Sequence, residues 1–144
     1  MTGLSTDVVA FLESMVVPGV LSTLRPDGSP ITSAVWFGFL DGDIVISTPA
    51  GRNKARNARE DGRVSFLVDT KERPYRGVAI EGVAELLDDP DGALVALIAR
   101  RYVGAEADAW VAARSATAER VILRIRPRRV RPWNMAASAA QQVQ

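Results

Sequence analysis

The sequence contains no cysteine and no histidine in its 144 residues. It therefore cannot form a disulfide bond, a His/Cys metal site, or a catalytic centre that depends on a thiol or an imidazole. These absences exclude zinc deaminases, zinc proteases and Ser-His-Asp hydrolases. Only a carboxylate site for Mg²⁺ or Ca²⁺ stays open in principle, and we expect no metal.

Long apolar runs and an excess of either charge are also missing. No run of about 18 uncharged apolar residues occurs, so no membrane-spanning helix is expected. Asp7 and Glu13 interrupt the apolar residues near the N-terminus, so no signal peptide is expected either. The net charge is only +1, which disfavours a nucleic-acid binder. We expect a cytoplasmic protein that binds neither nucleic acid nor membrane.

Composition and local pattern predict an α+β chain that is mainly β. Apolar residues make up 47% of the sequence, which is enough to form a core. Turn residues such as Asp41-Gly42-Asp43 separate the apolar stretches. Strands are expected over 20–24, 30–40, 44–48, 64–68, 78–87 and 120–126. Helices are expected after a cap at Thr6 or Asp7, and over 52–59, 91–103 (capped by Asp89) and 105–115.

The connections between these strands favour a small closed barrel. Tight turns join the first three strands, and strands do not alternate regularly with helices, so the sheet should be antiparallel. We expect residues 1–135 to form one domain. Residues 136–144 have little to hold them and are expected to form a flexible tail.

The sharpest local feature is a basic helix start after a strand that ends in two hydroxyls, Ser47 and Thr48. The expected helix contains three cations in its first turns: Arg52, Lys54 and Arg56. Helix N-termini normally carry acidic residues, because the dipole there is positive. The reversed charge fits a bound anion such as a phosphate. A solvated basic helix face is the alternative, and no Gly-Lys-Ser/Thr of a P-loop is present.

A second feature is the run Ser33-Ala34-Val35-Trp36, which places small and polar groups within a long apolar strand. A planar ligand fits against such a backbone. The alternative is an ordinary barrel strand whose tryptophan packs in the core or at a subunit contact, and this run taken alone favours the alternative.

Further along the chain, Glu81 and Glu85 lie on one face of a strand, about 13 Å apart. They are too far apart to flank one bond, so we expect outward carboxylates paired with arginine. Six arginines lie between 120 and 131. They form either a solvated strand face, a patch for an anionic tail, or, as the least favoured interpretation, a nucleic-acid site with Trp133 stacking on a base.

Several short motifs together resemble the split β-barrel flavin/deazaflavin oxidoreductases, which are related to pyridoxamine-phosphate oxidase. The resemblance covers about residues 8–133. Its motifs are the strand-turn-strand 19–30, Arg52-x-Lys54-x-Arg56-Asn57, Asp61-x-Arg63-Val64-Ser65, and Tyr75-Arg76-Gly77-Val78-x-Ile80-Glu81-Gly82-x-Ala84-Glu85. It implies a six-stranded antiparallel split β-barrel with short flanking helices, and a homodimer with cofactor sites at the interface.

The resemblance also implies which residues bind the cofactor. Its phosphate would be held by Lys54 with Arg52 and Arg56, assisted by Ser47 and Thr48 and next to Asn57. Its ring would lie along Ser33, Ala34, Val35 and Trp36. The segment Tyr75, Arg76 and Gly77 would approach it from the next strand, and Arg131 and Trp133 would reach the partner subunit's site.

The implied activity is hydride transfer from reduced coenzyme F420, a deazaflavin, to an electron-poor small molecule. The cofactor supplies the difficult chemistry, which suits a chain without an obvious acid/base pair. The alternatives are an FMN-binding oxidase or reductase of the same fold, and a cofactor-binding protein without catalytic activity. No catalytic residue is assigned.

Overall fold

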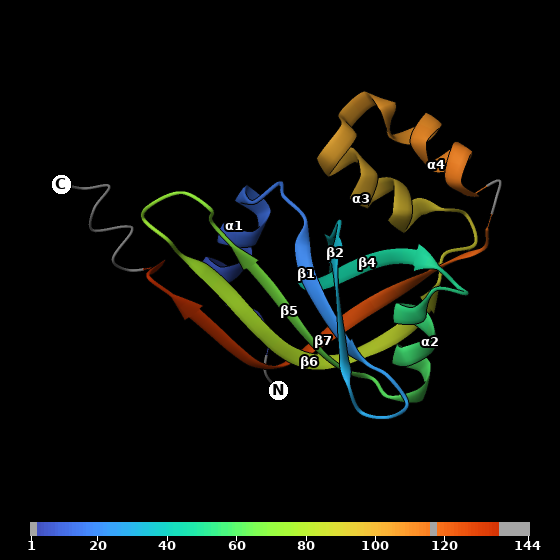
Figure 1. Ribbon diagram of the computed structural model, residues 1–144. Coiled ribbons are helices and arrows are strands. Elements are labelled where there is room, and N and C mark those ends of the chain that lie inside the picture. Colours follow the sequence, from blue (N-terminus) through green and yellow to red (C-terminus); the bar gives the residue numbers. More distant parts are fainter. Residues whose placement is uncertain (1–2, 116–117, 136–144) are drawn as a thin grey trace.

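A computed structural model describes residues 3–115 and 118–135, in which seven antiparallel strands form one sheet (Figure 1). The strands are β1 (Gly19–Leu24), β2 (Pro30–Val35), β3 (Gly38–Leu40), β4 (Asp43–Pro49), β5 (Arg63–Asp69), β6 (Gly77–Asp88) and β7 (Arg120–Trp133). Their order across the sheet is β2-β1-β5-β6-β7-β4-β3. The α+β prediction is confirmed, and the tail expected over 136–144 lies outside the described residues.

The sheet closes because its two edge strands are consecutive in the chain. Only Trp36 and Phe37 separate β2 at one edge from β3 at the other. The prediction of one strand over 30–40, and with it the count of six strands, is therefore wrong. The main-chain N–H of Phe37 donates to the Tyr102 hydroxyl at 3.2 Å instead of to a neighbouring strand. This contact satisfies the Phe37 N–H where the chain has left β2 and crosses to the other edge.

The last strand is longer than its apolar pattern predicted. The alternation ends at Arg126, but β7 continues to Trp133 and pairs along β6 as far as Gly77. A register shift lies at Glu81/Gly82. An ideal Cβ on Gly82 would lie 2.4 Å from the Arg126 carbonyl oxygen, so only glycine fits this close approach.

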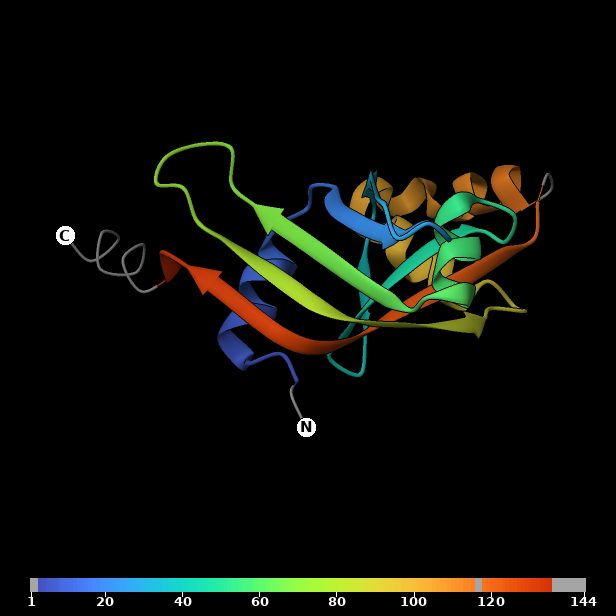
Figure 2. The ribbon, with the colours of Figure 1, turned by 60° about the horizontal axis from the view of Figure 1, so that its bottom comes forward.

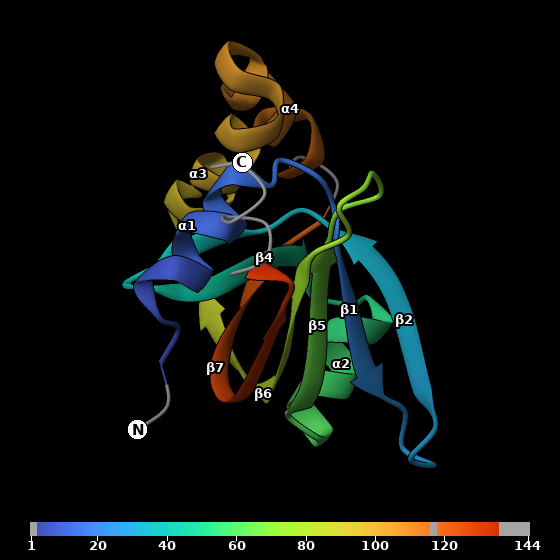
Figure 3. The same ribbon diagram turned by 90° about the vertical axis from the view of Figure 1, so that its left-hand side faces the viewer.

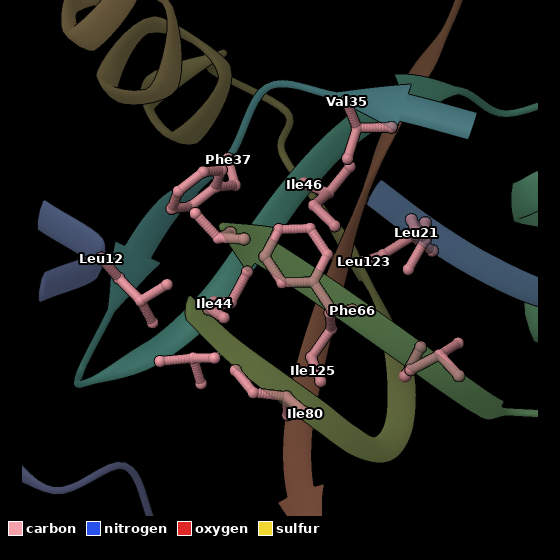
Figure 4. Close-up of a cluster of buried hydrophobic side chains, with 14 of the residues drawn as sticks. Leu12, Leu21, Val35, Phe37, Ile44, Ile46, Phe66, Ile80, Leu123 and Ile125 are labelled. Carbon is pink, nitrogen blue, oxygen red and sulfur yellow. The ribbon is translucent and has the colours of Figure 1, made fainter. Parts of the chain in front are cut away.

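The interior of the barrel is filled by apolar side chains from every strand. Figure 4 shows side chains from different strands meeting around Phe37 and Phe66. The two rings lie edge to face with centroids 5.3 Å apart. Leu12 of the first helix closes one end of this cluster and is fully buried. Such close-packed, fully buried residues supply most of the hydrophobic stabilisation.

Four α-helices cover parts of the barrel: α1 (Thr6–Ser14), α2 (Asn53–Glu60), α3 (Ala93–Val103) and α4 (Ala107–Ser115), with a 3₁₀ turn, η1 (Gly104–Glu106), between the last two. The predicted helices are thus confirmed to within two residues. Ser5 caps α1, one residue before the expected cap. The N-cap of α3 is Gly92 rather than the predicted Asp89, but the Asp89 carboxylate still accepts from the N–H groups of Leu94 and Val95 in the first turn.

The helices are not evenly distributed. The helices α3 and α4 form a hairpin beside β3 and β4, whereas α1 lies toward the opposite end of the barrel (Figures 1 and 3). None of the helices in the described parts of the chain is long and apolar enough to cross a membrane. The arrangement leaves the end of β4 and the start of α2 beside the hairpin.

We expect Tyr102→Phe to destabilise the fold, because the buried N–H of Phe37 loses its acceptor while the ring remains. The loss in free energy of unfolding should be about 1–3 kcal/mol, measured by urea denaturation. Tyr75→Phe is the matched control, since Tyr75 is 53% exposed. Equal stability of the two variants would contradict the role given to the Tyr102 hydroxyl.

Candidate functional site

A cavity of about 460 Å³ lies where the ends of β2 and β4 meet the start of α2, the helix α4 and the start of β7. Figures 1 and 2 show α2 and α4 at the same end of the barrel, on either side of the end of β4. The cavity is lined by Ala34, Val35, Trp36, Ser47, Thr48, Pro49, Arg52, Lys54, Trp110, Arg114, Ala118 and Arg120.

Positive charge dominates this cavity. Four cationic side chains line it, namely Arg52, Lys54, Arg114 and Arg120, and among the described lining residues there is no carboxylate. Burial, followed by the charges of Arg52 and Arg120, lowers the pKa of Lys54 below its usual value. Burial, followed by the charges of Arg114 and Arg52, likewise lowers the pKa of Arg120. The cations therefore repel one another, and a bound anion would relieve this repulsion.

Hydroxyl groups lie beside these cations at the end of β4. Thr48 is 1% exposed, and its Oγ1 has no hydrogen-bond partner among the described residues. Buried hydroxyls nearly always have a partner, so an unpaired one in a cavity points to an absent ligand or water. Arg52 is the N-cap of α2, and no side-chain hydrogen bond caps that helix end. The end of β4 and the start of α2 thus offer donors to an anion.

An aromatic column forms the wall opposite α2. The ring of Trp36 stacks on Tyr102 at 4.7 Å and on Trp110 at 4.8 Å between centroids. The guanidinium of Arg114 lies 4.1 Å from the Trp110 ring on α4. This column connects the barrel crossover at Trp36 to the helical hairpin. It also fixes one of the four cations at the cavity.

The cavity brings together seven of the residues predicted from the sequence: Ala34, Val35, Trp36, Ser47, Thr48, Arg52 and Lys54. Ser33 is half-buried, on the opposite strand face from Ala34. Arg56 is exposed on α2 and does not line the cavity. Asn57 is buried and donates to the Thr23 hydroxyl at 3.1 Å, so it ties α2 to β1.

The segment Tyr75–Gly77 lies at the other end of the molecule, beside the end of β7 (Figure 2). Arg76 borders a second cavity of about 560 Å³ there. An ideal Cβ on Gly77 would lie 2.5 Å from the Trp133 ring, so this glycine lets Trp133 pack against the strand. Within one chain, these three residues are not brought to the cationic cavity.

Sequence reasoning missed three side chains of the site, Trp110, Arg114 and Arg120. The apolar pattern over 105–115 predicts a helix but does not indicate which face is functional, and Arg120 belongs by sequence to the arginine run of the last strand. A helix carrying Trp110 and Arg114 four residues apart was the available signal, because such residues share one face.

The other arginines of β7 are mostly paired with carboxylates. Arg124 and Arg126 contact Asp43 at 3.0 and 2.9 Å, and Arg126 also contacts Glu85 at 3.2 Å. Glu81 pairs with Arg129 and Arg131. The expectation that Glu81 and Glu85 pair with arginine is confirmed. The arginines of β7 thus fall into two groups. Arg120 lines the cavity, whereas four others, Arg124, Arg126, Arg129 and Arg131, pair with carboxylates.

Both the sequence and the fold of this chain match those of known proteins. The sequence model of the family "Pyridoxamine 5'-phosphate oxidase" matches residues 4–134. A conserved hypothetical protein from Mycobacterium tuberculosis shares 33% identity, with 96% of this chain and 89% of that chain covered and a TM-score of 0.80. A structure described as an F420 reductase shares 28% identity, with 89% and 98% covered and a TM-score of 0.71.

More distant relatives share the fold alone. The heme storage protein HutZ from Vibrio cholerae is 15% identical, with 90% of this chain and 94% of that chain covered and a TM-score of 0.68. Proteins of this shape therefore serve different ligands, and the ligand of a given chain has to be argued from its own side chains.

We expect sulfate binding to weaken as the pH rises from about 7 to about 10, because the lowered pKa of Lys54 makes its ammonium lose its proton earlier than an ordinary lysine. Sulfate keeps its charge over this range, so the change reports on the protein. Calorimetric titration measures it. Lys54→Arg should flatten the pH dependence, and an equal decline in both proteins would contradict the assignment.

Proposed function

This chain belongs to the pyridoxamine 5'-phosphate oxidase family, and on that premise we propose that it is an oxidoreductase that uses coenzyme F420. The observation that carries the proposal is the cavity at the end of β4, which four cationic side chains line together with Ser47 and Thr48, and whose described lining residues include no carboxylate. A phosphate-bearing cofactor satisfies both the charge and the hydroxyl.

The residues present fit such a cofactor. Lys54 and Arg52 would hold the phosphate from the start of α2, and Ser47 and Thr48 would hydrogen-bond to it from the end of β4. The open edge of β2 at Ala34 would lie along the ring. Trp36 is already stacked on both faces, so it serves as a rigid wall rather than as a partner that moves onto the ring.

When bound, the cofactor supplies a hydride to an electron-poor acceptor. The chain contributes binding, orientation and exclusion of water. None of the described side chains that line the cavity is a carboxylate or a tyrosine. The acceptor's proton would therefore come from the Lys54 ammonium, from solvent or from the partner subunit. The cationic cavity would also favour a reduced, negatively charged ring.

FMN is the second candidate cofactor. It is the flavin alternative that the family resemblance offers, and it too carries a phosphate that the cationic cavity would bind. Heme is disfavoured by the absence of histidine from the sequence. We propose a cytoplasmic location, because the sequence has no cysteine for disulfide bonds and because the proposed cofactor is a soluble molecule.

We also propose that the protein acts as a homodimer. Two large exposed apolar side chains lie at the end of the barrel away from α4: Tyr75 is 53% exposed and Trp133 37%. Tyr75 and Trp133 are held together, because the Asn134 side chain donates to the Tyr75 carbonyl at 2.7 Å. A second copy covering this end would bury these groups.

The cofactor assignment predicts that F420 binds more tightly than FMN, measured by fluorescence titration. Lys54→Ala should weaken F420 binding by about 10- to 100-fold, since a charge-assisted hydrogen bond is lost. Lys71→Ala is the matched control, because Lys71 is the only other lysine and forms a surface pair with Asp69. Tighter binding of FMN would move the protein to the flavin branch. Unchanged affinity of Lys54→Ala would refute the phosphate site.

The dimer proposal predicts twice the chain mass in light scattering coupled to size-exclusion chromatography. Tyr75→Glu should shift the protein toward the monomer, because it places a charge in the apolar interface. Leu97→Glu is the control, since Leu97 is 40% exposed on α3 at the other end of the molecule. A monomeric wild-type protein, or equal effects of both variants, would overturn the proposed interface.

A further inference from the structure

We propose that Arg120 is a positioning residue of the anion site, which turns the Ser47 hydroxyl into a hydrogen-bond donor to the bound anion. The proposal rests on the proposed function in that the natural anion is the cofactor phosphate. The geometry that supports it belongs to the free protein, so it applies to any phosphate in the cavity.

The hydrogen bonds of Ser47 fix the direction of its proton. The Nε–H of Arg120 donates to Ser47 Oγ at 2.9 Å, and Nη2 donates to the Ser47 carbonyl oxygen at 3.3 Å. A guanidinium has only donors, so the serine oxygen must be the acceptor. The hydroxyl proton is left over, and none of the described residues accepts it. Because Ser47 lines the cavity, an anion there is the acceptor that completes the bond.

The strand register makes this contact possible. Arg120 pairs with Pro49 across β4 and β7, and Ser47 lies two residues before Pro49. Residues two apart in a strand point to the same face, so the Arg120 side chain reaches Ser47 by running back along β4. Its guanidinium passes 5.9 Å from the ring of Trp110. The indole therefore helps to confine the guanidinium over β4.

The choice of partner explains why this arrangement serves an anion. The cationic groups facing Arg120 are Arg52, Lys54 and Arg114, and its hydrogen-bond partner is a neutral serine rather than a carboxylate. A carboxylate partner would cancel the positive field of Arg120. A serine leaves the charge uncompensated, so the same side chain attracts the anion and orients a donor toward it.

Lysine cannot replace arginine in this role. The planar guanidinium places two donors on Oγ and O of the same residue, whereas an ammonium is a point charge on a flexible chain. Arg120→Lys therefore keeps the charge and removes the positioning. This difference separates the proposal from a purely electrostatic role for Arg120.

The test is a double-mutant cycle of Ser47→Ala and Arg120→Lys, with the affinities for F420 and for inorganic phosphate as readouts. Each single variant should weaken binding by about tenfold, the effect of one lost hydrogen bond. The double variant should bind within about twofold of Ser47→Ala. A further tenfold loss in the double variant would overturn the proposal, because Arg120 would then act independently of Ser47.

Two further variants keep the test decisive. Arg114→Lys, which leaves both Arg120–Ser47 contacts in place, should combine with Ser47→Ala in an additive manner. Ser47→Thr retains the hydroxyl and should keep the affinity within about threefold, even if Arg120→Lys fails to fold. A loss as large as that of Ser47→Ala would overturn the positioning role.

The two ligands separate failure of this inference from failure of the cofactor assignment. If phosphate binds with the expected coupling but F420 does not, the positioning role is supported and the cofactor assignment fails. If F420 binds and the cycle is additive, the cofactor assignment stands and the positioning role is overturned. Binding of neither ligand to the wild-type protein overturns both.

Discussion

The barrel depends on a link of only two residues, Trp36 and Phe37, which joins the two edge strands of the sheet. Because β2 and β3 occupy opposite edges, the link between them must cross the barrel opening without adding a loop. Phe37 enters the core and Trp36 stays outside it, stacked on Tyr102. The same crossing therefore completes the core and supplies one wall of the cavity. A change at the crossing would disturb fold and site together, as expected when a site is built on rigid elements.

In the free protein, the cavity holds several cations close together, which is electrostatically unfavourable. Partly burying Lys54 and Arg120 next to other cations lowers both pKa values, which shows that the charged forms are disfavoured there. On the outer face of β7, Arg126 and Arg129 pair with carboxylates, whereas the described residues that line the cavity include no carboxylate. This contrast is the basis for treating the cavity as a candidate ligand site, because an arginine in a structural ion pair needs a carboxylate partner whereas an arginine in an anion site needs to be without one.

Much of the strand pattern and half of the site were predictable from local sequence. Ser47, Thr48, Arg52 and Lys54 lie within eight residues of one another, so a strand end and a helix start suffice to bring them together. The crossover at Trp36 was not predictable, because it depends on the hydroxyl of Tyr102, 65 residues away from Phe37. The length of β7 was missed for a related reason. Its second half is held by pairing with β6, not by its own apolar alternation.

The helix α4 is the part of the site with the weakest structural support, and this sets how the site can respond to a ligand. Ala107 is its only buried residue, so its position depends on its contact with α3 and on the stack of Trp110 between Trp36 and Arg114. An anion held by Arg114 and Arg120 would tie α4 to β7 from the other side. Such binding would stabilise α4, because a ligand that binds only the ordered state shifts the equilibrium toward it. The barrel thus provides the hydrogen-bond donors at the end of β4, and α4 provides the opposite wall of the cavity with Trp110 and Arg114.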